Sequence, residues 1–583
     1  MSDWLSRFDA VWSIDFEFSC PPGERPRVAC MVAREFHSDR IVRIGIKELV
    51  SLDRPPFKMD ESVLFVAYFS SAEWSCFLSL GWPLPERVLD LWCEFRNLLN
   101  GTHPTAGFSL LGCLAYFGMD SINTTEKQAM RELAMSGGPY TEQQMESLLD
   151  YCQSDVDALH RLLPKMMPSI DFPRALLRGR YMCAVAKMEH VGIPIDMQML
   201  SLLRRQWEAI REGLIESING PFGVYEGQSF KRDRFATYLT QNEIPWPRTE
   251  RGQLRLDNET FREQAKMFPQ INPLRELRHT LSELKLEKLS VGEDGRNRTL
   301  LRPFASRSGR NQPSNNQFIF GPSVWLRSLI RPEKGTSIAY VDWSQQELGI
   351  AAALSGDKGL QKAYDSGDPY LEFAKMAGAV PTNATKQSHS AERTAFKVCM
   401  LATQYGMSEH GLAKKLNKPL AFARNLLRQH REAFPVFWRW SQSQVDSAML
   451  SKKLQTVFGW TLRTVGGDNA RSLANFPMQA NGAEMMRLAC SMATEAEIRV
   501  CCPVHDAILV EAPTSEIDDV VKKTQSIMRE ASRLVLDGYD LESDAKVIRY
   551  PDRYADEGRG TAMWEKVIGL AKESERSAQV VSS

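Results

Sequence analysis

Residues 337–357 read SIAYVDWSQQELGIAAALSGD, and their hydrophobic pattern changes halfway along. A β-rich run ends at Asp342, and the residues after it predict a helix whose first turn contains Ser344, Gln345, Gln346 and Glu347. A carboxylate at the end of a strand is well placed to hold a metal ion over a cleft. Capping of the following helix is an alternative role for Asp342, and this stretch alone favours neither.

A second segment, PVHDAILVEA at residues 503–512, has a polar pair between two apolar runs. This pattern predicts a strand–turn–strand hairpin with His505 and Asp506 at the turn. On its own the pair is typical of an ordinary polar turn.

A third segment, AERTAFKVCMLATQYGMSEHGLA at residues 391–413, predicts a helix. Its residues Arg393, Lys397, Leu401 and Tyr405 recur every four positions and so share one face. The two cations can neutralise the phosphates of a triphosphate, and the aromatic ring can lie against the incoming base or the template. A solvated basic face is the alternative for an isolated pair of this kind.

Together the three segments resemble motifs A, B and C of the family A DNA polymerases. DWSQQEL is similar to the family's DYSQxEL, VHD at 504–506 matches its third motif, and RxxxKx(7)YG is matched by Arg393, Lys397, Tyr405 and Gly406. The order and spacing also agree. The resemblance extends from residue 176 to about residue 559 through SRSGRNQPSNN (306–316), VFGWTLR (457–463) and RSLANFPMQANGAEMMRLA (471–489).

The resemblance implies phosphoryl transfer by two divalent ions about 3.5–4 Å apart, Mg²⁺ with Mn²⁺ as a substitute. It implies that Asp342 and Asp506 hold these ions, with the carbonyl of Trp343 as a further ligand. Glu347 would be the steric gate against a ribose 2′-hydroxyl. The resemblance also implies that the nucleotide is bound by Glu347, Arg393, Lys397, Leu401 and Tyr405. It implies that primer and template are contacted, mostly through the minor groove, by Arg310, Arg471, Asn475, Gln479 and His505.

The sequence departs from the family pattern at several positions. Leu401 stands where Phe or Tyr is usual, so the usual stacking on the sugar is not expected. Ala507 replaces the Glu that usually follows the motif C Asp, which leaves two core carboxylates, and two are enough to bridge both ions. Gly349 replaces a common Arg, and Pro369–Tyr370 replaces a common Ile–His pair, so one internal ion pair and one phosphate contact are expected to be missing.

Near the N-terminus, SIDFEFSC places Asp15 and Glu17 on one side of a predicted strand. YCQSDVDALHRLL places Tyr151 and Asp155 on one face of a predicted helix. In this order, ahead of the polymerase motifs, the two segments resemble the first and third motifs of the DEDDy 3′→5′ proofreading exonucleases. The resemblance implies four carboxylates that bind two Mg²⁺ ions, with the Tyr orienting the attacking water.

The second exonuclease motif is the poorest match. VAYFSSAEW has Phe69 in place of Asn and Glu73 in place of Asp, so Glu73 is expected to be the third carboxylate. The alternative is Asp90 in RVLDLWCEF, for which a capping role beside a buried helix is expected instead.

These motifs predict an α/β, ribonuclease H-like exonuclease domain over residues 1–175. A mixed α+β polymerase right hand follows over 176–583, with the thumb at about 196–318, the fingers at about 385–445 and the palm in the remainder. Two helices are predicted most clearly: RYMCAVAKMEHVGIPID, closed by Gly192 and Pro194, and the amphipathic LRELRHTLSELKLEKL at 274–289.

Composition excludes several classes of protein. The 583 residues are 43% hydrophobic and 25% charged, which is typical of a globular protein with large cores. Seventy-two basic residues balance 72 acidic ones, which argues against a nucleic-acid coat protein but allows one basic cleft. The 11 cysteines form no CxxC pair, and we find neither a signal peptide nor a membrane-length apolar run, so a cytoplasmic location is expected.

The leading hypothesis is a DNA-directed DNA polymerase with 3′→5′ proofreading. Its expected partners are primer–template DNA and deoxynucleoside triphosphates, with helicase, single-strand-binding or processivity factors as further candidates, no membrane, and a monomeric state. Because only a short leader precedes Asp15, no 5′-nuclease domain is expected there. That layout resembles the compact bacteriophage enzymes and predicts a role in phage DNA replication in the host cytoplasm.

Two alternatives remain open at this point. One is an enzyme similar to the single-subunit RNA polymerases, against which Glu347 and the exonuclease motifs argue. The other is a non-catalytic scaffold that binds primer and template.

Overall fold

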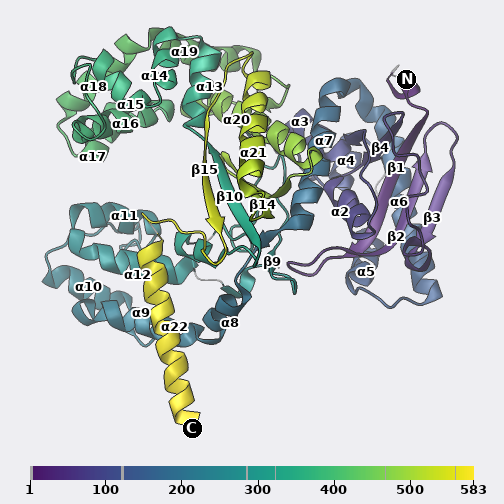
Figure 1. Cartoon of the computed structure of the whole chain (residues 1–583), viewed down its shortest axis with the longest axis horizontal. Helices are drawn as coiled ribbons and strands as arrows, with labels where there is room; N and C mark the ends of the chain where they lie inside the picture. Colours follow the sequence, from purple (N-terminus) through teal and green to yellow (C-terminus); the bar gives the residue numbers. More distant parts are fainter. Residues whose placement is uncertain are drawn as a thin grey trace.

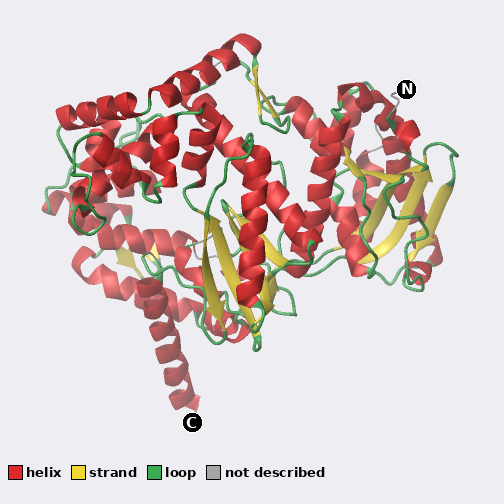
Figure 2. Cartoon of the chain, turned by 45° about the horizontal axis from the view of Figure 1, so that its top comes forward, coloured by secondary structure: helices red, strands yellow, loops and turns green. Residues whose placement is uncertain are grey.

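The computed structural model describes residues 4–119, 124–283, 286–321, 323–466, 468–558 and 560–582. The chain is built around two sheets, an N-terminal one of five strands and a C-terminal one of four. In Figure 1 the N-terminal sheet lies at the right, the C-terminal sheet in the centre and two helical lobes at the left, and Figure 2 shows the two sheets as separate groups of yellow arrows. Within the described ranges, no helix combines the length and the apolar character needed to cross a membrane.

The N-terminal sheet has the strand order β3-β2-β1-β4-β5, in which β1, β2 and β3 are antiparallel while β4 and β5 run parallel to β1. Its strands are Ala10–Ser19, Arg27–Glu35, Ile41–Gly45, Val63–Ala67 and Val88–Asp90. Helices α2 (Ser71–Ser79) and α3 (Leu91–Leu99) follow β4 and β5 directly, and α6 (Glu142–Met166) packs on β1 and β2. The predicted α/β class of this domain is therefore observed.

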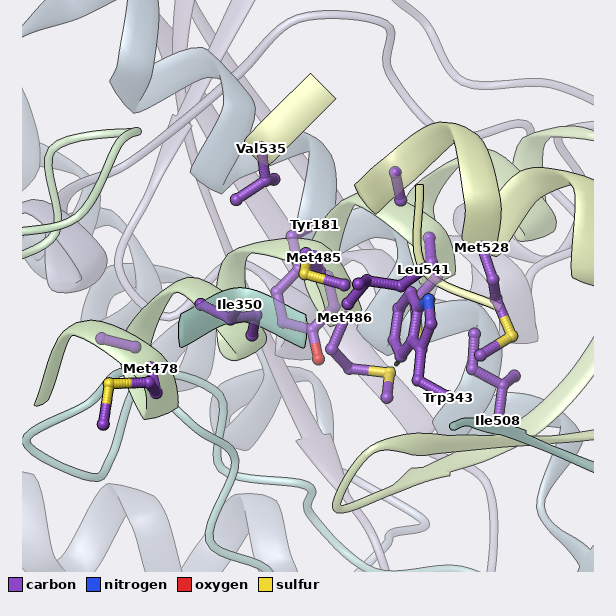
Figure 3. Close-up of a cluster of buried hydrophobic side chains, with 14 of the residues drawn as sticks. Tyr181, Trp343, Ile350, Met478, Met485, Met486, Ile508, Met528, Val535 and Leu541 are labelled. Carbon is purple, nitrogen blue, oxygen red and sulfur yellow. Dashed lines mark hydrogen bonds between the residues drawn. The ribbon is translucent and has the colours of Figure 1, made fainter. Parts of the chain in front are cut away.

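The C-terminal sheet is antiparallel throughout, in the order β13-β14-β10-β15. Its strands are Arg499–Val504, Ala507–Pro513, Thr336–Trp343 and Ser543–Arg549. Strand alternation turns Trp343 into the core, where it is 1% exposed, and leaves Asp342 on the opposite face. Figure 3 shows the indole of Trp343 among Leu541, Met528 and Ile508.

Helices α20 (Ala470–Glu495) and α21 (Ile517–Val535) cover this sheet together with α7 (Phe172–Val191). Helix α7 also packs against α2 and β5 of the N-terminal domain. The boundary expected at residues 175/176 thus falls inside one helix that both domains share. The helix ends at Gly192 with a φ of 67°, as its sequence predicts.

Two helical lobes extend from the C-terminal sheet (Figure 1). One contains α14 (Lys358–Asp365), α15 (Pro369–Met376), α16 (Ser390–Gln404), α17 (Glu409–Leu416), α18 (Leu420–Ala433) and α19 (Pro435–Ser451). The other contains α8 (Met197–Arg205), α9 (Trp207–Phe222), α10 (Arg232–Gln241), α11 (Asn258–Met267), α12 (Asn272–Glu283) and the last helix, α22 (Thr561–Ser582). Helix α22 packs on α8 and α9, although the sequence interpretation assigned its residues to the palm.

Two helix boundaries differ from expectation. The amphipathic helix predicted over 274–289 is described as far as Glu283, residues 284–285 lie outside the described ranges, and Leu286–Lys288 forms a 3-10 turn instead of a continuation. The helix after Asp342, α13 (Gln346–Ser355), begins at Gln346 because Gln345 adopts a left-handed φ of 51°. Its cap residue is Gln345, and no side chain caps it, so the alternative role of Asp342 as a helix cap is wrong.

Hydrogen bonds join the two domains beside the loop that contains Arg310. The amide of Asn100 donates to the carbonyl oxygens of Arg307 (2.7 Å) and Thr461 (2.9 Å). The backbone N–H of Arg463 donates to the carbonyl of Asn100 (2.8 Å), and Arg96 Nη2 donates to the carbonyl of Ala305 (2.8 Å). The N-terminal domain therefore fixes the backbone of the loop on which Arg310 lies.

Candidate active sites

The ends of three strands bring Asp342 and Asp506 together. Asp342 lies near the end of β10, and Asp506 lies in the β13–β14 turn, where His505 has a left-handed φ of 57°. The N–H of Trp343, whose carbonyl is an expected ligand, donates to the carbonyl of Asp506 over 3.2 Å. This bond ties the end of one motif to the turn of the other. The hairpin predicted from the sequence is thus observed, with both polar residues at its turn.

Burial and mutual repulsion perturb this pair of carboxyl groups. Burial, then the neighbouring Asp506, which also shares a hydrogen bond, and then Asp544 raise the pKa of Asp342 to about 7. Burial also raises the pKa of Asp506. Asp342 Oδ1 is buried and has no hydrogen-bond partner in the described part of the chain. Two adjacent carboxylates with an orphaned oxygen fit a hard divalent cation, which relieves the repulsion and coordinates that oxygen.

A cavity of about 360 Å³ opens next to the pair. It is lined by residues from all three motifs, among them Glu347, Leu401, Tyr405, His505 and Asp506. The structure therefore gathers into one cavity side chains that are far apart in the chain, from Arg310 to Asp506.

Glu347 is held from two sides of this cavity. Arg310 Nη2 donates to Glu347 Oε1 over 3.0 Å, and the hydroxyl of Tyr405 donates to Glu347 Oε2 over 2.8 Å. Burial and then the nearby Glu347 carboxylate raise the pKa of Tyr405 to about 12, so its hydroxyl stays a donor near neutrality. These bonds fix the Glu347 carboxylate at the wall of the cavity.

Arg393 and Lys397 lie on one face of α16, as predicted. Arg393 Nε donates to Asp368 Oδ2 over 2.5 Å, and its guanidinium carbon lies 5.4 Å from the centroid of the Tyr370 ring. Lys397 Nζ lies 5.5 Å from the same centroid. Tyr370 therefore sits beneath both cations and contributes cation–π attraction, a role that the sequence comparison did not reveal.

The expected DNA-contacting residues fall into two groups. Arg310 and His505 line both the cavity above and a second one of about 440 Å³ that reaches Tyr181 and Arg487. Arg471, Asn475 and Gln479 recur every four residues along α20 and share one accessible face. Arg471 also packs beside Gly406, where an added Cβ would come within 2.8 Å of its Cγ.

A second group of carboxylates lies in the N-terminal domain. Asp15 and Glu17 are on β1, Glu73 is in the first turn of α2, and Tyr151 and Asp155 are on α6. Burial, followed by the charges of Asp15 and Glu17, raises the pKa of Glu73 well above its usual value. Glu73 is 4% exposed, and its Oε2 has no hydrogen-bond partner among the described residues. This orphaned oxygen beside two further carboxylates fits a divalent cation.

Tyr151 and Asp155 lie beside this group. Burial, then the charges of Asp155, Glu17 and Asp15, raise the pKa of the Tyr151 hydroxyl, which also bonds to Asp155. The structure thus brings all five predicted exonuclease residues together.

Asp90 has a different role. It ends β5 and caps α3, accepting hydrogen bonds from the N–H groups of Cys93 (2.9 Å), Ser70 (2.6 Å) and Phe69 (3.3 Å), and from Ser70 Oγ (2.7 Å). These bonds occupy its oxygens, so the expected capping role is confirmed.

Cys152 is a member of the N-terminal group that sequence reasoning missed. The ligand atoms of Asp15, Glu17 and Cys152 lie within 4.8 Å of one another. Cys152 Sγ donates to the carbonyl oxygen of Asp15 (3.2 Å) and to its Oδ2 (3.4 Å), and burial raises the pKa of the thiol well above its usual value. It therefore acts as a protonated donor that orients Asp15. Its place next to Tyr151 in the predicted helix was the available signal.

Comparison with known proteins agrees with the polymerase half of this picture. DNA polymerase I of Chloroflexus aurantiacus is 24% identical over 433 residues, which cover 68% of this chain and 45% of that protein. The thermostable DNA polymerase I of Thermus thermophilus is 26% identical over 464 residues, covering 73% and 53%. The chain thus spans about half the length of these relatives.

One solved structure, the POL domain of Pol1 from M. smegmatis in complex with DNA primer–template and dNTP, shares the fold. The TM-score is 0.72 at 18% identity, over 94% of this chain and 97% of that one. The family model of DNA polymerase family A matches residues 256–547, half of the chain, and includes both Asp342 and Asp506. The chain belongs to DNA polymerase family A.

Proposed function

We propose that the protein is a template-directed DNA polymerase with a 3′→5′ proofreading exonuclease. The observation that carries the polymerase proposal is the meeting of Asp342 and Asp506 beside a cavity lined by Glu347, Leu401 and Tyr405. The relatives named DNA polymerase I support it.

In the polymerase reaction, Asp342 and Asp506 would hold two divalent ions, Mg²⁺ or Mn²⁺, with the Trp343 carbonyl as a further ligand. When bound, these ions supply charge neutralisation and activation of the primer hydroxyl. Arg393 and Lys397 bind the triphosphate, and Tyr405 lies against the base or template. Glu347 excludes a ribose 2′-hydroxyl by occupying its space, which favours deoxynucleotides over the ribonucleotides of an RNA polymerase.

Arg310, Arg471, Asn475, Gln479 and His505 contact the primer–template. In this proposal the helical lobe at about 385–445 is the fingers, the lobe at about 196–318 is the thumb, and the C-terminal sheet is the palm.

In the exonuclease reaction, the ions would be held by Asp15, Glu17, Glu73 and Asp155, and the hydroxyl of Tyr151 would orient the attacking water. The support is the burial of Glu73 against Asp15 and Glu17. Accessory replication partners, a monomeric state, a cytoplasmic location and a bacteriophage role stay predictions from the sequence.

Primer extension on a primed template tests the proposal, with deoxynucleotides and ribonucleotides offered separately. Asp506→Ala should lower extension by several orders of magnitude, because an ion is left under-coordinated. Asp15→Asn is the matched control, and should keep extension while losing degradation of single-stranded DNA. Extension by folded Asp506→Ala at the wild-type rate would show that the site is misassigned. A wild-type protein that binds primer–template but does not extend the primer would favour a non-catalytic scaffold.

A further inference from the structure

Three residues lie in one row across the C-terminal sheet. Asp342 on β10 is directly opposite Ala507 on β14 and directly opposite Asp544 on β15. Residues that face each other across antiparallel strands point to the same side, with Cβ atoms about 4.5–5.5 Å apart. Asp342 therefore has a methyl group on one flank and a carboxylate on the other.

Asp544 is exposed, and its negative charge is not neutralised. No ion pair joins it to a basic side chain within the ranges that the structure describes. The hydroxyl of Ser344 donates to Asp544 Oδ2 over 2.8 Å, so Oδ1 can still accept from another donor. The charge of Asp544 adds to the repulsion at Asp342, which either protonation of Asp342 or a bound cation relieves.

A second observation is the buried Oδ1 of Asp342, which has no hydrogen-bond partner among the described residues and could coordinate a cation. We infer that Asp544 supplies the third carboxylate of this cation site, from the flank of Asp342 opposite Ala507. The inference rests on the proposed function, because it assumes that Asp342 and Asp506 hold divalent ions. It explains how the site can do without a carboxylate at position 507.

Mg²⁺ usually keeps several of its water ligands, and outer carboxylates that accept hydrogen bonds from such waters strengthen binding. An exposed side chain at the edge of the site suits this role. Loss of such an outer partner typically weakens metal binding about 10-fold to 100-fold.

A purely structural role for Asp544 would be to fix the turn after β10 through Ser344. Two variants separate the roles. Asp544→Asn keeps an oxygen that can accept from Ser344 but removes the charge. Ser344→Ala removes the hydrogen bond but keeps the charge.

The measurement is Mn²⁺ affinity by electron paramagnetic resonance, on full-length protein bound to primer–template and carrying Asp15→Asn and Glu17→Gln to weaken the N-terminal site. We expect Asp544→Asn to raise the Kd for Mn²⁺ about tenfold. Ser344→Ala should leave the Kd within about twofold of the parent. Glu542→Gln removes an acid two positions away, just before β15, one that accepts from Arg529, and should also leave the Kd unchanged.

Two outcomes would overturn the inference alone. In the first, Asp544→Asn binds Mn²⁺ like the parent while Asp506→Ala loses binding. In the second, Ser344→Ala weakens binding as much as Asp544→Asn, which assigns Asp544 to the turn. If Asp506→Ala also binds Mn²⁺ and extends primers like the parent, the proposed function fails as well.

Discussion

The hydroxyl of Tyr405 donates a hydrogen bond to Glu347 over 2.8 Å, and thereby joins the end of α16 to the first turn of α13. The bond holds the Glu347 carboxylate at the cavity wall even before a nucleotide is present. In the proposed gate role, a carboxylate fixed in this way would exclude a 2′-hydroxyl by its volume.

Shortening the gate should therefore relax sugar selection. We expect Glu347→Ala to raise the ratio of kcat/KM for ribonucleotides to that for deoxynucleotides by about tenfold or more. Tyr405→Phe keeps the ring and loses only the hydrogen bond, so its effect should be smaller. Steady-state single-nucleotide insertion gives both ratios. If the ratio of kcat/KM for ribonucleotides to that for deoxynucleotides is unchanged in Glu347→Ala, Glu347 is not the steric gate.

Leu401 should make the enzyme discriminate against dideoxynucleotides. It lines the cavity proposed to bind the nucleotide, and it carries no hydroxyl that could replace a missing sugar 3′-hydroxyl. We expect Leu401→Tyr to use dideoxynucleotides about tenfold more readily or better, whereas Leu401→Phe, with the ring alone, should not. Competition between dideoxy- and deoxynucleotides in primer extension measures this. Equal dideoxynucleotide use by the wild type and Leu401→Tyr would refute the role of Leu401.

Substitution of Glu73 should affect exonuclease activity, whereas substitution of Asp90 should affect stability. Glu73→Gln should abolish degradation of single-stranded DNA and preserve primer extension, because a metal-binding oxygen is lost in one domain only. Asp90→Asn should instead lower the melting temperature, because its new NH₂ group would face backbone donors; an unsatisfied buried donor costs about 1–3 kcal/mol. If Asp90→Asn is the variant that selectively loses degradation at unchanged stability, Glu73 is not the third carboxylate.

The stability of the metal-free protein should depend on pH through Asp342. Its pKa rises from 3.8 to about 7 on folding, so the stability that this group contributes is fully present below about pH 3.8 and is lost as the pH rises to about 7. We expect the free energy of unfolding of the wild type, relative to Asp342→Asn, to fall across this range in urea titrations.

Added Mg²⁺ should reduce that loss above pH 7, because cation binding favours the ionised carboxylates. A difference between wild type and Asp342→Asn that stays constant with pH, with or without Mg²⁺, would contradict this expectation.

Local patterns were enough to predict the strand ending near Asp342, the hairpin around His505 and Asp506, and the shared face of Arg393 and Lys397. Each of these features depends on the spacing of hydrophobic residues, or on the residue types that favour a turn, within about ten positions of the chain. The same holds for the capping role of Asp90, since its neighbours in sequence form the helix that it caps.

Features that depend on pairing between distant segments could not be predicted. The place of Asp544 beside Asp342 follows from the register of two strands about 200 residues apart. The bond from Cys152 to Asp15 follows from the packing of α6 on β1. The late start of α13 follows from the left-handed φ of Gln345, a residue type that gives no signal for that conformation.

The hydrogen bonds of Asn100 to Arg307 and Thr461 bear on how a polymerase without exonuclease activity should be engineered. Deleting the N-terminal domain would leave those carbonyl groups, and the helix α7 that both domains share, facing solvent. Because the loop that contains Arg310 is anchored there, truncation should impair primer binding as well as stability. Substitution of Asp15 and Glu17 in the intact chain should remove the proposed exonuclease activity and keep that anchor.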